Sequence, residues 1–129
     1  MVNDIKWYKL HGLPETASYG KYYDFKENRW VVPELSRASI TDEIRRRYFS
    51  DRTAAALRAM KEVADSKGIT MAQLALAWVI KRSEQLGITL IPITSATRAS
   101  HIDEAVEALS VSLKDDDMKA IDEALQGKG

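Results

Sequence analysis

The sequence contains no cysteine, which excludes disulfide bonds and thiolate metal sites. It has no excess charge either, because 19 Lys and Arg residues balance 19 Asp and Glu residues. No overall positive field would therefore draw the chain to nucleic acid or to an acidic membrane. The histidines, His11 and His101, lack metal-ligand spacing relative to the carboxylates. We therefore expect neither a metal site nor a nucleic-acid partner.

Long hydrophobic runs are missing as well. No stretch reaches the roughly eighteen apolar residues that a membrane helix needs, and residues 1–10 do not resemble a secretory signal. The basic run at residues 45–47 is best interpreted as a solvated surface. We expect no membrane association and a cytoplasmic location, with which the lack of cysteine is consistent.

The chain has 129 residues, of which 45% are apolar, enough for one ordinary core. Residues 1–47 are rich in aromatic, charged, Gly and Pro residues but show no sustained periodicity, which predicts irregular structure with short helical or extended pieces. Residues 48–129 have regular patterns and predict the order helix, helix, strand, helix, helix.

Helix start and stop signals are clearest in the middle of the chain. Ser50 is a good N-cap and Gly68 a C-terminal stop, so we predict a helix over residues 51–67. Thr70 and Gln73 have capping-box spacing ahead of a strongly apolar run, which predicts a second, largely buried helix. The amphipathic spacing of Ile102, Val106 and Leu109 predicts a helix at about 98–109. The acidic run at residues 115–117 marks the start of a last helix at about 115–125.

Residues 88–93 form a continuous apolar run, typical of a strand covered on both faces in a parallel sheet. A single strand among four helices is awkward, because its backbone N–H and C=O groups need neighbouring strands. Three explanations remain open: residues 1–47 supply unrecognised strands, chains associate, or the chain is a piece of a larger α/β protein.

A polar turn follows this predicted strand and leads into a helix that carries Arg98 in its first turn. Helix N-termini present free backbone N–H groups and the positive end of the dipole, and a guanidinium can grip two phosphate oxygens. This pattern predicts a phosphate ligand. The alternative is that Arg98 is a solvated side chain, although there it would oppose the helix dipole.

Three segments resemble the C-terminal part of aldo-keto reductases: residues 20–22 (Gly-Lys-Tyr), residues 68–78 (Gly-Ile-Thr-Met-Ala-Gln-Leu-Ala-Leu-Ala-Trp) and residues 91–98 (Ile-Pro-Ile-Thr-Ser-Ala-Thr-Arg). Members of this family are TIM barrels, which usually need about 250 residues. The resemblance therefore implies an α/β fold consisting of the C-terminal part of a TIM (β/α)8 barrel. This part would be incomplete and predominantly helical, with one clear parallel-type strand.

The same resemblance implies NADP as cofactor, with its adenosine 2′-phosphate held after strand eight of the barrel. Arg98 falls on the Lys or Arg that meets this phosphate, and Glu104 on the acidic residue that contacts the adenine amino group. His101 replaces an Arg and Ala105 an Asn, which removes one cation and one adenine contact. Losing one charge-assisted hydrogen bond typically weakens binding by ~1.5–3 kcal/mol. The implied cofactor-binding residues are Ser95, Thr97, Arg98, His101 and Glu104.

No residue of this chain matches the family's catalytic Asp, Tyr, Lys and His, which lie on early strands of the barrel. The resemblance thus implies an NADP(H)-binding portion of an oxidoreductase, inactive alone and dependent on a complementing barrel half that would also supply further cofactor contacts. The alternative is a non-catalytic barrel remnant that acts through self-association or partner binding at the edge of residues 88–93.

Overall fold

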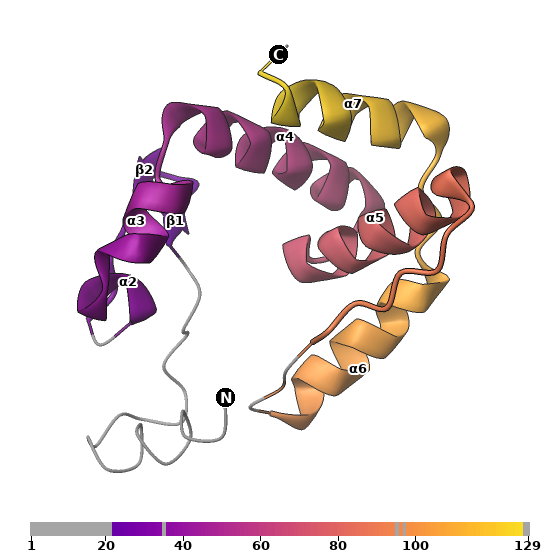
Figure 1. Cartoon of the computed structure of the whole chain (residues 1–129), viewed down its shortest axis with the longest axis horizontal. Coiled ribbons are helices and arrows are strands. Elements are labelled where there is room, and N and C mark those ends of the chain that lie inside the picture. Colours follow the sequence, from indigo (N-terminus) through magenta and orange to yellow (C-terminus); the bar gives the residue numbers. More distant parts are fainter. Residues whose placement is uncertain (1–21, 35, 95, 97, 128–129) are drawn as a thin grey trace. The chain divides into compact units, whose positions relative to one another are not determined.

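The computed structural model describes residues 22–34, 36–94, 96 and 98–127. The chain divides into two compact units, with the boundary between Phe49 and Ser50. Among the described residues, Figure 1 shows the short strands β1 and β2 and the small helices α2 and α3 in the first unit, and longer helices in the second. The predicted cofactor-binding residues all belong to the second unit.

The first unit is organised by aromatic side chains. Strands β1 (Tyr23–Asp24) and β2 (Arg29–Trp30) pair antiparallel, with Tyr23 opposite Trp30. The Trp30 ring stacks on Phe49 at a centroid distance of 4.4 Å and meets Tyr23 edge-on. Helices α2 (Arg37–Ile40) and α3 (Asp42–Tyr48) follow the hairpin. Tyr23, Trp30 and Phe49 of this unit thus pack against one another as ring pairs.

Helices α4 (Asp51–Lys67) and α5 (Met71–Leu86) begin and end where the sequence signals predict. Ser50 Oγ accepts a hydrogen bond from the Thr53 N–H, and Thr70 and Gln73 form a capping box. Both helices end at glycines, Gly68 and Gly87, with φ values of 65° and 63°. These left-handed conformations are costly for residues with a Cβ, so the glycines explain the sharp stops.

The core of the second unit lies where α4 and α5 meet α7 (Asp115–Leu125). Burial on α5 is confined to one face, around Leu74 and Ala77, while Ala75 is exposed. Most other residues of α5 are half-buried, so the helix is less buried than its apolar sequence predicts. The buried cluster consists of Ala64, Leu74, Ala77, Leu113, Met118 and Ile121.

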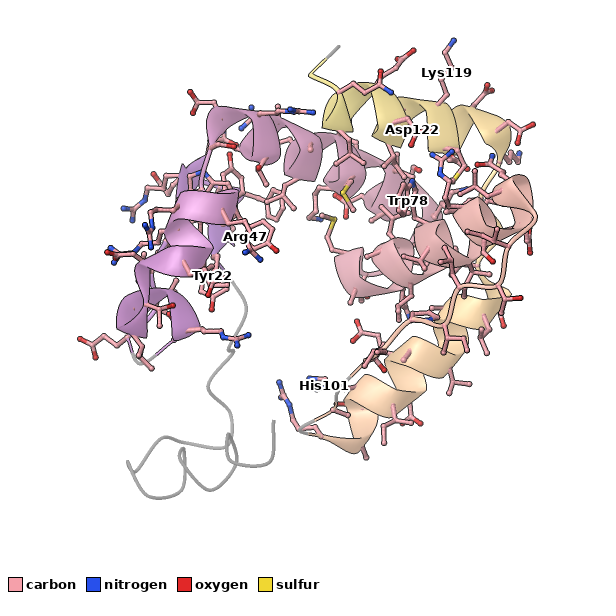
Figure 2. The ribbon with its side chains drawn as sticks, in the orientation of Figure 1. Tyr22, Arg47, Trp78, His101, Lys119 and Asp122 are labelled. Carbon is pink, nitrogen blue, oxygen red and sulfur yellow. The ribbon has the colours of Figure 1, made fainter. Side chains whose placement is uncertain are left out.

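A polar cluster at the edge of this core links α5 to α7. The Arg82 guanidinium forms an ion pair with Asp122 and lies 5.2 Å from the centre of the Trp78 ring. Figure 2 labels Trp78 on α5 and Asp122 on α7. Both charged side chains are mostly buried, with 26% and 31% of their surface exposed. Partial burial strengthens such contacts relative to exposed pairs, so this cluster helps to fix α7 against α5.

The predicted strand at residues 88–93 is not formed. The segment has no strand partner in the described part of the second unit, and Ile91 and Ile93 are 82% and 90% exposed. Only its start is fixed, by Ser83 Oγ, which donates to the Ile88 C=O and accepts from the Leu90 N–H. The physical reason is that a strand is stabilised by neighbours, and here none is available.

The remaining helices are α6 (Ala99–Glu107) and α7, separated by the 3-10 turn η1 (Ala108–Ser110). On α6 and η1, Ile102, Val106 and Leu109 are at least 58% exposed. In the described residues the only sheet is the antiparallel pair of β1 and β2. The structure is thus mostly helical and is not a closed barrel, although the helices around residues 88–93 follow the predicted order.

No helix in the part of the chain that the structure describes combines the length and the apolarity needed to cross a lipid bilayer.

Asp117 connects the start of α7 to the end of α4. Its carboxylate accepts from the Lys114 N–H and pairs with Lys67 Nζ, both at 2.8 Å. Burial alone would raise the pKa of Asp117, but the Lys67 and Lys114 hydrogen bonds and the Lys67 charge lower it below its ordinary value of 3.8. A carboxylate with a lowered pKa in the folded state stabilises that state above its unfolded pKa.

Asp117→Asn is therefore expected to lower the free energy of unfolding by about 1 kcal/mol at neutral pH, since it weakens a cap and an ion pair. The difference in unfolding free energy between the variant and the unaltered chain should shrink as the pH falls through the lowered pKa of Asp117. The protonated Asp117 side chain is then neutral, as the asparagine is at every pH. Urea unfolding of both proteins, at neutral pH and well below pH 3.8, measures this difference in unfolding free energy. Asp116→Asn, on the exposed side of the same turn, should change little.

Candidate functional site

An open cleft of about 630 Å³ lies between the N-terminal ends of α5 and α6. Its walls come from the start of α5 and the residues just before it, from Arg98, and from the length of α6. All of these belong to the second unit. The lining residues are Gly68, Thr70, Gln73, Arg98, Ser100, His101, Asp103, Glu104 and Glu107.

The N-terminus of α6 opens onto this cleft without a side-chain cap. Its N-cap is Arg98, in an extended conformation with φ −141° and ψ 151°, and the Arg98 side chain makes no capping hydrogen bond. The N–H groups of Ala99 and Ser100 therefore have no acceptor within the helix. The first turn also lacks acidic residues. These features leave the positive end of the helix dipole available to an anion.

The structure brings three of the five predicted site residues together. Arg98, His101 and Glu104 all line the cleft, and Figure 2 shows His101 at the N-terminal end of α6. Ser95 and Thr97 lie outside the described residues. The segment that joins the exposed Ile93 to Arg98 is thus described only at Thr94 and Ala96.

Glu104 is held by the start of α5, a contact that the sequence did not suggest. The Thr70 hydroxyl donates to Glu104 Oε1, and Gln73 Nε2 donates to the Glu104 carbonyl at 3.3 Å. Gln73 Nε2 also donates to Glu107 Oε2 at 3.0 Å. Sequence reasoning treated Thr70 and Gln73 only as capping residues, because the capping signal alone cannot reveal a contact with a helix thirty residues away.

Charges are ordered along α6. Arg98 and the free amide groups lie at its N-terminal end, and Glu104 and Glu107 lie one to two turns later. At a rise of 1.5 Å per residue, Arg98 and Glu104 are separated by about 9 Å along the helix. The cleft thus offers a cationic end suited to a phosphate and a carboxylate end suited to hydrogen-bond donors. That polarity fits a ligand with an anion at one end and an amino group at the other.

Within the described ranges of the chain, no three His, Asp or Glu side chains are grouped so as to hold a metal ion. Two of the carboxylates that line the cleft, Glu104 and Glu107, accept hydrogen bonds from Thr70 and Gln73, respectively. The charged and polar side chains that line the cleft can take part in ionic and hydrogen-bonding recognition.

Similar proteins were found by two comparisons. The family model described as aldo/keto reductase family matches residues 13–126, which is most of the chain. The sequence is 31% identical over 96 residues to "Versiconal hemiacetal acetate reductase" of Aspergillus parasiticus, covering 74% of this chain and 26% of the relative. No solved structure matches with significant similarity.

Two plant proteins are also similar. A "Probable voltage-gated potassium channel subunit beta" of Arabidopsis thaliana is 32% identical over 88 residues, covering 67% of this chain and 26% of the relative. "Probable aldo-keto reductase 1" of Glycine max is 39% identical over 56 residues, which cover 43% of this chain and 15% of the relative. The chain spans about a quarter of the length of the first two relatives. Because the family model matches over residues 13–126, the chain belongs to the aldo/keto reductase family, a family of oxidoreductases.

Proposed function

We propose that this chain is the NADP(H)-binding C-terminal portion of an aldo-keto reductase-like oxidoreductase. The observation that carries the proposal is the cleft at the start of α6, which combines Arg98, an uncapped helix N-terminus and Glu104. In this proposal Arg98, the backbone N–H groups of Ala99 and Ser100, Ser95 and Thr97 hold the 2′-phosphate. His101 lies at the edge of the same phosphate site.

The base would lie further along α6. Glu104 has the chemistry to accept a hydrogen bond from an adenine amino group, and its position about 9 Å from Arg98 separates the base from the phosphate. The donor and acceptor types of the cleft thus fit an adenosine 2′-phosphate. A bound nicotinamide cofactor would supply the hydride for carbonyl reduction.

Reduction itself would depend on residues that this chain does not offer. No residue here matches the family's catalytic Asp, Tyr, Lys or His, so we propose that turnover requires a complementing barrel half. That half would also supply the pyrophosphate and nicotinamide contacts. Cofactor binding, rather than turnover, is therefore the direct test of the proposed function, and a cytoplasmic location stays a prediction.

Arg98→Ala is expected to weaken NADPH binding ~10–100-fold, since it removes charge-assisted hydrogen bonds to the 2′-phosphate. NADH lacks that phosphate, so its weaker binding should not change. A fluorescence titration of each cofactor into the full chain measures both affinities.

Arg46→Ala is the matched control, because it removes an exposed guanidinium from α3, which contributes no residue to the cleft. It should leave NADPH binding unchanged. Failure of the unaltered chain to bind NADPH at millimolar concentration, or an equal loss in both alanine variants, would contradict the proposed cofactor site.

A second proposed function is assembly with another polypeptide strand, either in a second copy of the chain or in a complementing barrel half. The observation that favours it is the extended segment at residues 88–93, in which Ile88, Leu90, Ile91 and Ile93 are all exposed. Apolar segments with unpaired backbone groups recruit further strands. This function would not require bound cofactor.

A further inference from the structure

We propose that Thr70 and Gln73 are positioning residues of the nucleotide site, which fix Glu104 so that the site selects a purine with an exocyclic amino group. The inference rests on the proposed cofactor function and deepens it. It adds two α5 residues to a site otherwise built from α6 and the residues before it. Through Glu104, these two residues would control the discrimination between bases.

The Thr70 hydroxyl has two tasks in the structure. As the N-cap of α5, its oxygen accepts from the Gln73 N–H at 3.1 Å. A hydroxyl that accepts in this way still has its own hydrogen to donate, and Thr70 donates it to Glu104 Oε1. Capping therefore holds the Thr70 side chain in the orientation that binds the carboxylate.

Gln73 completes the connection from a buried position. Only 7% of its surface is exposed, so its polar atoms need partners inside the protein. Its Oε1 accepts from the Thr70 N–H, and its amide group donates to the Glu104 carbonyl and to Glu107 Oε2. The amide thus holds both the backbone and a neighbouring carboxylate of α6 at the start of α5.

These contacts leave one oxygen of Glu104 for a ligand. Thr70 occupies Oε1, and no described residue hydrogen-bonds Oε2. A carboxylate accepts hydrogen bonds but cannot donate them, so Oε2 suits an amino group and repels a carbonyl oxygen. Adenine carries an amino group at the position where hypoxanthine carries a carbonyl. A fixed Glu104 should therefore favour adenine over hypoxanthine.

The experiment compares binding of adenosine 2′,5′-bisphosphate and inosine 2′,5′-bisphosphate to the full chain by calorimetry. The unaltered chain should prefer the adenosine form about tenfold. Thr70→Ala should reduce that preference to about twofold or less, since Glu104 is then free to turn away. Thr70→Ser keeps the hydroxyl and should restore the preference.

Gln73→Glu separates capping from positioning. Glutamate is also a normal residue at this place in a capping box, so the α5 cap is retained, while both amide donors are lost. The added charge also faces Glu107. We expect a reduced preference for adenosine with the helix content unchanged.

Ser50→Ala is the matched control, because it removes the same kind of cap from α4, which contributes no residue to the cleft. It should keep the base preference. If Thr70→Ala keeps the tenfold preference for the adenosine form, the inference is overturned but the proposed function is not. The same holds if Ser50→Ala loses the preference as much as Thr70→Ala does. Absence of binding of either bisphosphate to the unaltered chain overturns the proposed function, and the inference with it.

Discussion

Leu74→Ala is expected to lower the free energy of unfolding of the second unit by about 2–5 kcal/mol. Leu74 is fully buried, at 0% exposure, in the cluster that joins α5 to α4 and α7. Part of this loss is the favourable free energy of burying the methyl and methylene groups that alanine lacks. The rest comes from the cavity left behind, which the neighbouring side chains fill only in part. A unit of this size has about 4–12 kcal/mol of total stability, so the variant should be partly unfolded under mild conditions.

Urea unfolding followed by circular dichroism and by tryptophan fluorescence measures this loss, since Trp78 packs against the same cluster. Leu86→Ala is the matched control, because Leu86 belongs to the same helix but is 59% exposed. It should change the stability by less than about 0.5 kcal/mol. Equal unfolding midpoints for the two variants would show that α5 does not form this core.

Most helices of the second unit could be predicted because their signals are local. Ser50, Thr70 and the two glycines that end α4 and α5 specify the ends of these helices through contacts within a few residues. The start of α7 was marked in the same way, by Asp115 and the acidic residues after it. Such signals depend little on the rest of the chain.

The segment at residues 88–93 shows the opposite case. Its apolar run predicted a buried strand, but a strand exists only when another segment pairs with it. The exposure of Ile91 and Ile93 shows that the described residues supply no such segment. The same reason explains the exposed apolar residues of α6, which the amphipathic pattern had assigned to a core.

The candidate site could be predicted in part. Motif matching pointed to Arg98, His101 and Glu104, and the structure brings these three to one cleft. It could not point to the contacts of Thr70 and Gln73 with Glu104, because these cross between helices and leave no periodic pattern. Their roles in nucleotide recognition stay predictions.

Replacing both Ile91 and Ile93 by lysine is expected to abolish self-association of the chain. These side chains are the most exposed large apolar residues in the described structure, and they lie in a segment that pairs with no strand of the described residues. Burying both on assembly would contribute about 3–6 kcal/mol, and lysines at the same positions would oppose pairing through charge repulsion. We expect the unaltered chain to form particles larger than 14.5 kDa and the double variant to be a monomer.

Size-exclusion chromatography with light scattering at several protein concentrations measures the mass of each variant. The control replaces Val32 and Ile40 of the first unit by lysine, since these are exposed apolar residues outside the extended segment. It adds the same charge and should keep the assembly. The assembly should also weaken when an unlabelled peptide of residues 88–93 is added, because the peptide offers the same backbone groups for pairing. A monodisperse monomer of the unaltered chain at all concentrations would refute self-association, because an exposed edge that binds its own copy must respond to mass action.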